Sequence, residues 1–314
     1  MDHHRPLSRF SLRLYLATFG VLVALLGAAC TPTNGGGGAT EVPDRPTVVV
    51  TYSVLGSVVQ ELVGDRATVV VLMGDGVDPH DWSPSARDIE TVTQAALVVA
   101  NGLALEEGLE RTLDEAEADG VRVFRATDHI TIRELEDDPH GDEDDHGDED
   151  PHFWVDPVSM RDVVLALATT LESVGVDVAD QAADLAGRLD DLDAEVRGTL
   201  EAVPPSERKL VTGHESMGYF ADRYSFRLIG AVIPGLTSQG EVSAGELAGL
   251  KDQIEEEGVR AIFTEIGTPS AVVESIGRET GVRVVELPSH NLPADGSYLT
   301  FIREIAGAIA SALS

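Results

Sequence analysis

Residues 47–73 read TVVVTYSVLGSVVQELVGDRATVVVLM, and this stretch decides the fold class. It opens with a β-branched run at 47–54 and closes with a valine-rich run at 67–73. The residues between them, 56–63, have the apolar spacing of a helix. Short apolar strands joined through helices are typical of a parallel sheet that is covered on both faces. The stretch therefore predicts an α/β fold.

The same alternation appears twice along the chain, on either side of one long helical pattern. In the first lobe, 47–176, we expect further strands at 96–100 and 121–126, with helices at 85–94, 105–118 and 158–174. In the second lobe, 204–314, we expect strands at 209–212, 227–233, 261–264 and 282–287, a helix opened by a Ser243/Glu246 capping box, and a last helix at 298–313. The two lobes flank a linking helix at 177–203, which ends before Pro204-Pro205 and would be about 40 Å long. We predict two small parallel-sheet α/β lobes joined by this one rigid helix.

The N-terminus has the features of a processing segment. Arg5, Arg9 and Arg13 precede an apolar stretch at 14–29, which predicts a secretory signal peptide at 1–29. Cys30 follows directly, where a bacterial lipoprotein is cleaved and lipidated, although Gly27 stands where such sites usually have leucine. An ordinary signal peptide followed by an unrelated cysteine is the alternative. We expect an extracytoplasmic protein that lipidated Cys30 and a flexible tether at 30–46 hold to the outer face of the cell membrane. A periplasmic location is the alternative.

Composition excludes several classes of function. Cys30 is the only cysteine, so the mature body has no intramolecular disulfide and no thiolate catalysis. The net charge of −33 argues against binding to nucleic acid or to anionic lipid head groups. Any metal site must therefore use nitrogen and oxygen ligands. We expect the protein to be a monomer.

Isolated histidines stand beside turn-forming residues at distant points of the chain. His80 follows the strand at 67–73 and precedes a helix that Ser83-Pro84 is expected to open. His214 and His290 each follow a predicted strand, and His152 lies in the motif PHFWVDP at 151–157. Ligands of parallel α/β sheets bind beyond the carboxyl ends of the strands, so all four histidines can face one crevice between the lobes. Neutral imidazoles gathered in this way suit zinc.

The segment 134–150 is almost purely acidic and contains His140 and His146. Its charges repel one another and it has almost nothing apolar to bury, so we expect a mobile loop. The two histidines and the carboxylates predict weak, exchangeable zinc binding in addition to one tight site. A solvated linker is the alternative.

In these residues the chain resembles the metal-specific solute-binding proteins of bacterial ABC transporters, which deliver zinc or manganese. The resemblance rests on the order and spacing of six features. They are Asp78-Pro79-His80, the acidic loop, the motif at 151–157, the linking helix, the motif TGHESMGYF at 212–220 and the motif IFTE at 262–265. It implies that metal lies in the crevice, with His80 and His152 from the first lobe and His214 from the second. The usual fourth ligand of the family is a carboxylate after the last strand. Here His290 stands nearest that place, a departure from the pattern, with Asp295 as the alternative.

The resemblance implies high-affinity Zn²⁺ capture and delivery to an ABC permease, with no enzymatic activity. It also implies that Glu265 lies near the metal without binding it. Three or four imidazoles indicate zinc, whereas manganese-specific relatives tend to use two histidines and two carboxylates. A manganese-specific protein of the same type is one alternative, and a metal-stabilised surface adhesin is another. A zinc hydrolase is the third; it requires an open coordination position and a base such as Glu215 or Glu265, and the chain has no His-Glu-x-x-His motif.

Overall fold

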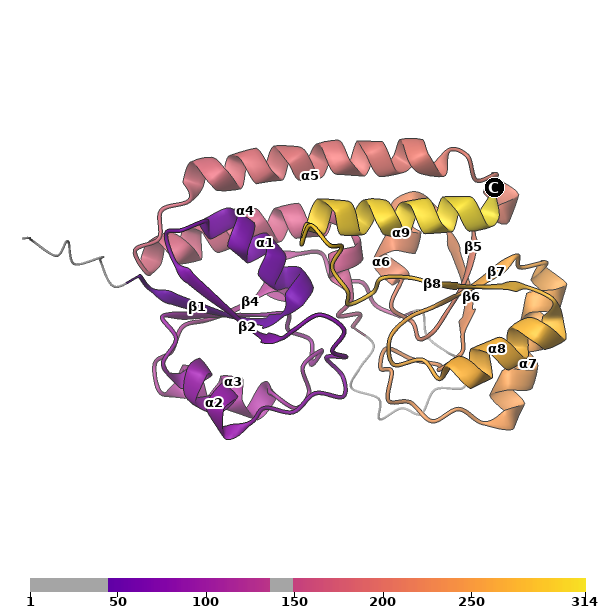
Figure 1. Ribbon diagram of the computed structural model, residues 1–314, viewed down its shortest axis with the longest axis horizontal. Coiled ribbons are helices and arrows are strands. Elements are labelled where there is room, and N and C mark those ends of the chain that lie inside the picture. The colour runs from indigo at the N-terminus through magenta and orange to yellow at the C-terminus, as the bar shows by residue number, and fades with distance from the viewer. Residues whose placement is uncertain (1–44, 136–148) are drawn as a thin grey trace, which may run out of the picture. The chain divides into compact units, whose positions relative to one another are not determined.

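Two four-stranded parallel sheets organise the protein in the computed structural model, which describes residues 45–135 and 149–314 (Figure 1). The first sheet has the order β2-β1-β3-β4, from strands β1 (Thr47–Tyr52), β2 (Thr68–Met73), β3 (Leu97–Ala100) and β4 (Val123–Arg125). The second has the order β6-β5-β7-β8, from strands β5 (Lys209–Thr212), β6 (Arg227–Ala231), β7 (Ala261–Thr264) and β8 (Arg283–Glu286). The predicted fold class, two parallel-sheet α/β lobes, is confirmed.

Helices cover both faces of the sheets. Those of the first lobe are α1 (Ser53–Val63), α2 (Ala86–Thr93), α3 (Glu110–Ala118) and α4 (Pro157–Ser173), with short 3-10 turns η1 (Ala126–His129) and η2 (Phe153–Val155). The second lobe has η3 (Pro205–Glu207), α6 (Gly218–Tyr224), α7 (Ala244–Glu257) and α8 (Ser270–Thr280). In β1, Val48 and Val50 enter one core cluster while Val49 enters another. Successive side chains of a strand point to opposite faces, so this alternation shows that β1 is buried on both sides.

Two long helices, α5 (Ala179–Leu200) and α9 (Tyr298–Leu313), run side by side along the two sheets (Figure 1). The apolar face of α5, which includes Leu189, Leu192 and Val196, is fully buried. Helix α9 also contacts α1 of the first lobe, and the Tyr298 hydroxyl donates to the carbonyl of Trp154 over 2.8 Å. The C-terminal helix therefore returns to the first lobe, and α5 is not the only element that contacts both lobes.

Several helix boundaries differ from the expectation, and the contacts at three of them explain the difference. Ser85, not Ser83-Pro84, opens α2, because Ser85 and Asp88 form a reciprocal capping box. Helix α3 begins at Glu110 instead of 105, since Leu103 and Ala104 adopt positive φ values and Glu106 turns inward to accept the amide of Asn101. Helix α5 ends at Leu200, whose carbonyl accepts from the Arg208 guanidinium. The capping box of Ser243 and Glu246 opens α7 as expected.

Candidate metal centre

Three of the four histidines lie in loops at the carboxyl ends of strands or beside a short turn. His80 is in the turn region between β2 and α2, His152 immediately precedes η2, and His214 follows β5. All are buried: His80 is 7%, His152 0% and His214 1% exposed. Parallel strands bring their carboxyl ends to one edge of a sheet, and so loops from each lobe can meet there.

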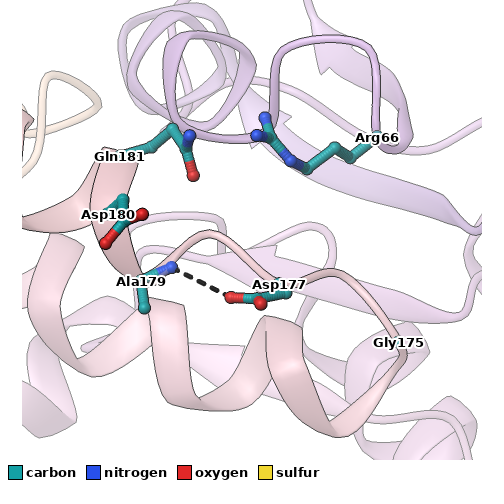
Figure 2. A pocket seen from close by; sticks show the side chains of 6 residues that line it. All are labelled: Arg66, Gly175, Asp177, Ala179, Asp180 and Gln181. Atoms are coloured by element: carbon teal, nitrogen blue, oxygen red, sulfur yellow. Dashed lines mark hydrogen bonds between the residues drawn. The ribbon is translucent and has the colours of Figure 1, made fainter.

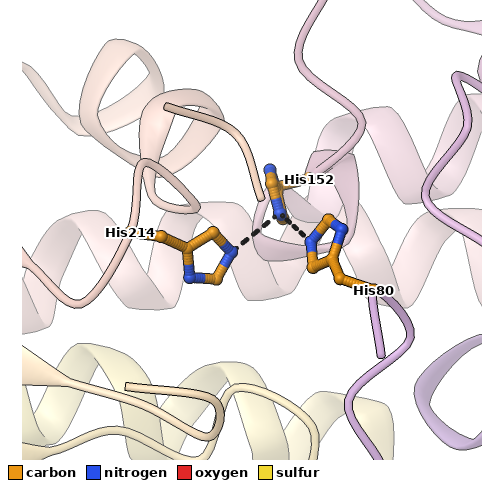
Figure 3. Close-up of side chains that lie close together, drawn as sticks. All are labelled: His80, His152 and His214. Atoms are coloured by element: carbon orange, nitrogen blue, oxygen red, sulfur yellow. Dashed lines mark hydrogen bonds between the residues drawn. The ribbon is translucent and has the colours of Figure 1, made fainter. Parts of the chain in front are cut away.

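Their side chains converge. His152 Nε2 lies 3.2 Å from His80 Nε2 and 3.1 Å from His214 Nε2, and one ligand atom from each ring lies within 4.8 Å of the others (Figure 3). Three imidazole nitrogens directed at one buried point form a donor set for a borderline-soft transition-metal ion. Among the described residues, this is the group of histidine and carboxylate side chains that can hold a metal ion.

Asp150 holds the ring of His152. Its Oδ1 atom accepts the His152 amide over 2.9 Å and lies 2.8 Å from Nδ1 of the ring. A proton on Nδ1 leaves the Nε2 lone pair free for a metal, which is the tautomer that a carboxylate partner selects. Burial lowers the pKa of His152 despite the opposing effect of Asp150. The ring is therefore neutral and correctly oriented before any cation arrives.

Glu265, at the end of β7, plays the corresponding part for His214. Its Oε1 atom lies 2.9 Å from His214 Nδ1, which is an ion-pair distance, although the angle does not suit a hydrogen bond. The same oxygen accepts the His214 amide over 3.2 Å. The Ser216 hydroxyl lies 2.7 Å from both carboxylate oxygens. Burial alone would lower the pKa of His214, but the carboxylate more than offsets it and raises that pKa. Burial opposes ionisation of Glu265, yet His214 and Ser216 lower its pKa to about 2.

His80 has no such partner. Its amide donates to Asp78 Oδ1 over 3.0 Å, while Nδ1 of its ring is buried without a hydrogen bond in the described part of the chain. Burial and the neighbouring imidazoles lower the pKa of His80 to about 2. The ring is thus a neutral ligand held by its backbone.

His290 lies beside the three-histidine cluster but is not one of the residues whose ligand atoms converge within 4.8 Å. It is 2% exposed, packs 5.5 Å from the Trp154 ring, and has a buried Nε2 atom without a partner among the described residues. Its carbonyl accepts the Gly76 amide over 3.0 Å, which ties it to the loop that carries His80. Burial lowers its pKa to about 3. An unsatisfied buried nitrogen next to the cluster is available to a fourth coordination position.

Asp295 stands elsewhere. It is exposed, and its carboxylate accepts the Ser297 amide over 3.0 Å and the Thr300 hydroxyl over 2.8 Å at the start of α9. The other carboxylate of interest, Asp156, is the N-cap of α4 and does not contact His152. Cys30, His140 and His146 lie outside the described residues.

Asp150 was not predicted to have a role in the site, because it stands at the end of the segment expected to be mobile. In the structure, Asp150 is fully buried, its amide donates to the Arg133 carbonyl, and Glu134 pairs with Glu149 in an antiparallel bridge. The expectation of mobility is therefore wrong at both ends of 134–150, because the ends pack on the protein. The available signal was the spacing Asp150-Pro151-His152, an acid two residues before a ligand candidate.

A hollow of about 450 Å³ beside the start of α5 has no part in this centre. It is lined by Arg66, Gly175, Asp177, Ala179, Asp180 and Gln181 (Figure 2). None of these is a histidine, and Asp177 accepts the Ala179 amide over 3.3 Å as a local turn contact. The histidines, by contrast, are closed off from solvent. None of the described helices is both long enough and apolar enough to cross a membrane.

Comparisons with known proteins identify the family of the chain. The family model described as "Zinc-uptake complex component A periplasmic" matches residues 48–312. The chain is 29% identical to the "High-affinity zinc uptake system protein ZnuA" of Bacillus subtilis, over 82% of this chain and 83% of that protein. It is 25% identical to the "Manganese-binding lipoprotein MntA" of Halalkalibacterium halodurans, over 84% and 85% respectively.

Solved structures of other proteins have the same fold. The periplasmic zinc-binding protein TroA from Treponema pallidum superposes with a TM-score of 0.74 at 27% identity, covering 86% of this chain and 99% of that chain. A crystal structure of ZnuA gives a TM-score of 0.73 at 25% identity, covering 86% and 100%. These names include both zinc and manganese proteins, so similarity alone leaves the metal open.

Proposed function

The chain belongs to the family of the periplasmic zinc-uptake component A, and from that premise we propose that it captures Zn²⁺ outside the cytoplasm and delivers it to an ABC permease. The observation that carries the proposal is the convergence of His80, His152 and His214 at one buried point, with carboxylates behind two of the rings. Capture and release require no chemical step, so we propose no enzymatic activity.

The ligand types favour zinc over manganese. Zinc accepts imidazole nitrogen in tetrahedral geometry, while manganese prefers oxygen ligands. The three convergent donors are all imidazoles, and the nearest buried carboxylates, Asp150 and Glu265, are engaged with the Nδ1 atoms of ligand rings. A manganese-specific protein is the second candidate, since one relative is named for manganese.

We propose His290 as the fourth ligand. Its unpaired, buried Nε2 atom and its contact with Trp154 support this assignment, whereas Asp295 is exposed and bound to the first turn of α9. A site of four imidazoles leaves no position for a reactive water, which argues against the hydrolase alternative.

The remaining proposals concern parts of the chain outside the described residues. We propose that lipidated Cys30 anchors the protein, as the names of lipoprotein relatives suggest. We also propose that His140 and His146 bind additional zinc weakly. Deletion of 136–148, which retains Asp150, should lower the zinc stoichiometry and leave the tight site unchanged; loss of the tight site would count against this division.

The direct test is competition titration of the metal-free protein with Zn²⁺ and Mn²⁺, paired with anomalous scattering at the zinc edge from a crystal. We expect zinc to bind tighter than manganese by orders of magnitude and its peak to lie between the three Nε2 atoms. Equal or tighter manganese binding would contradict zinc specificity, and a metal peak elsewhere would contradict the ligand set.

A further inference from the structure

Helix α6 of the second lobe holds the first-lobe segment that carries His152 at both ends. On one side of His152, the Tyr219 hydroxyl donates to the Asp150 carbonyl over 3.1 Å. On the other side, the Arg223 guanidinium donates to both oxygens of Asp156 over 2.9 and 2.8 Å. Helix α6 also begins four residues after His214. One short helix therefore positions ligand candidates from both lobes.

Arg133 extends this connection to the ring of His152. Its Nη1 atom donates to Asp150 Oδ2 over 3.3 Å, and its Nε atom donates to Asp222 Oδ2 on α6 over 3.0 Å. The opposite oxygen of Asp150, Oδ1, accepts both the amide and Nδ1 of His152. A continuous path of charged contacts thus runs from Asp222 in the second lobe through Arg133 and Asp150 to His152.

The packing around this path is tight. The Asp150 side chain is fully buried and that of Arg133 is 16% exposed, so the carboxylate depends on protein partners for its stabilisation. A Cβ atom at Gly218 would lie 2.5 Å from both Arg133 Nη1 and Asp150 Oδ2. Only glycine at this first position of α6 leaves room for the guanidinium, whose planar fork can engage two carboxylates at once.

We infer that Arg133 is a positioning residue that links the orientation of His152 to the separation of the two lobes. The inference rests on the proposed function, because it takes His152 as a metal ligand. When α6 moves away from the first lobe, the Asp222 contact draws the guanidinium from Asp150. Asp150 is then free to turn, and the His152 ring loses the partner that fixes it. A small movement between lobes would in this way weaken one metal–nitrogen bond and promote release.

The test measures zinc dissociation into an excess of chelator. Loss of a group that orients a metal ligand typically costs about 10–100-fold, so Arg133→Gln should raise the dissociation rate within that range. Asp222→Asn should raise it less, because Asp222 is 67% exposed and its pair is screened by water. The double variant should dissociate no faster than Arg133→Gln alone, since Asp222 acts only through Arg133; additive effects would overturn the path.

Two controls separate positioning from general stability. Arg161→Gln removes a guanidinium that also engages two carboxylates, Asp162 and Asp190, without contact to His152, and should leave dissociation unchanged. Arg133→Lys keeps a charge for Asp150 but lacks the fork, so it should restore dissociation only partly. The bridging role would be contradicted if Arg161→Gln raised the zinc dissociation rate as much as Arg133→Gln does. It would also be contradicted if Arg133→Lys dissociated as slowly as the wild type.

A metal-free measurement keeps the inference separate from the proposed function. In the metal-free protein, Arg133→Gln and Asp222→Asn should both speed hydrogen exchange of the backbone amides at 150–156, whereas Arg161→Gln should not. Unchanged exchange in Arg133→Gln would overturn the inference even if the wild-type protein binds zinc tightly. Absence of zinc binding by the wild type would overturn the proposed function, while the exchange result would still decide whether Arg133 orders the His152 segment.

Discussion

The histidines of the centre divide into two pairs that the protein supports differently. His152 and His214 each have a buried carboxylate at Nδ1, Asp150 and Glu265 respectively. Within the described residues, the rings of His80 and His290 have no carboxylate partner, and their loops are joined by the hydrogen bond between the Gly76 amide and the His290 carbonyl. The first pair is oriented before metal arrives, whereas the second is placed mainly by its loops.

The two supported histidines also differ from each other. Asp150 shares its charge with Arg133, and the pKa of His152 is lowered by burial. Among the described residues, Glu265 contacts His214 and the Ser216 hydroxyl but no arginine or lysine, and the pKa of His214 is raised. The same carboxylate–imidazole contact is thus accompanied by a lowered pKa at His152 in one lobe and a raised pKa at His214 in the other.

The largest expected effect comes from removing a supported ligand. His152→Ala and His214→Ala should each raise the zinc dissociation constant by more than the roughly 100-fold that loss of an outer partner can cost. His290→Ala should weaken binding less, because three converged imidazoles remain. Titration calorimetry or competition with a chelator measures this order, and near-wild-type affinity in either of the first two variants would remove that histidine from the ligand set.

Neutralising the supporting carboxylates should give the next effect. Asp150→Asn and Glu265→Gln should each lower zinc affinity about 10–100-fold, since the ring loses the charge that orients it and increases its basicity. Glu265→Gln should cost more, because in the described part of the chain no arginine or lysine offsets the charge of Glu265, whereas Arg133 pairs with Asp150. The same competition titration checks this, and equal losses would show that the Arg133 contact does not matter to Asp150.

Proton release distinguishes the two rings directly. Glu265 raises the pKa of His214 above the ordinary 6.5, whereas burial lowers the pKa of His80 to about 2 and that of His290 to about 3. Zinc must displace the His214 proton, so affinity should fall as pH falls through that raised pKa. Calorimetry in buffers of different ionisation enthalpy should show proton release that increases as the pH falls through that raised pKa, and less release in Glu265→Gln. Release of two or more protons would contradict the assignment.

The smallest effect is expected at Asp295. Asp295→Ala should leave zinc affinity unchanged and lower the unfolding midpoint slightly, because its carboxylate accepts only from Ser297 and Thr300 at the start of α9. Thermal unfolding and titration of the same sample measure both. A marked loss of zinc affinity would transfer the fourth position from His290 to Asp295.

Local sequence signals predicted much of this architecture. The β-branched runs became β1 and β2, the Ser243/Glu246 capping box opens α7, and helix 298–313 matches α9. These features depend on neighbours within a few residues, which the sequence shows directly. Boundaries failed where a contact outside the helix itself decides them: Arg208 caps the carbonyl of Leu200, and Glu106 turns inward to Asn101.

By itself, the sequence determined the repeated α/β pattern and the identity of the histidines, because periodicity and residue chemistry are properties of the chain. Only the tertiary structure decided which histidines converge and which groups support them. Asp150 looked like part of a charged run, yet it is buried against Arg133 and His152. Asp295 looked like a ligand, yet it faces solvent. The orientation of a side chain depends on contacts between residues far apart in sequence, such as Arg133 and Asp222, and these exist only after the lobes have packed together.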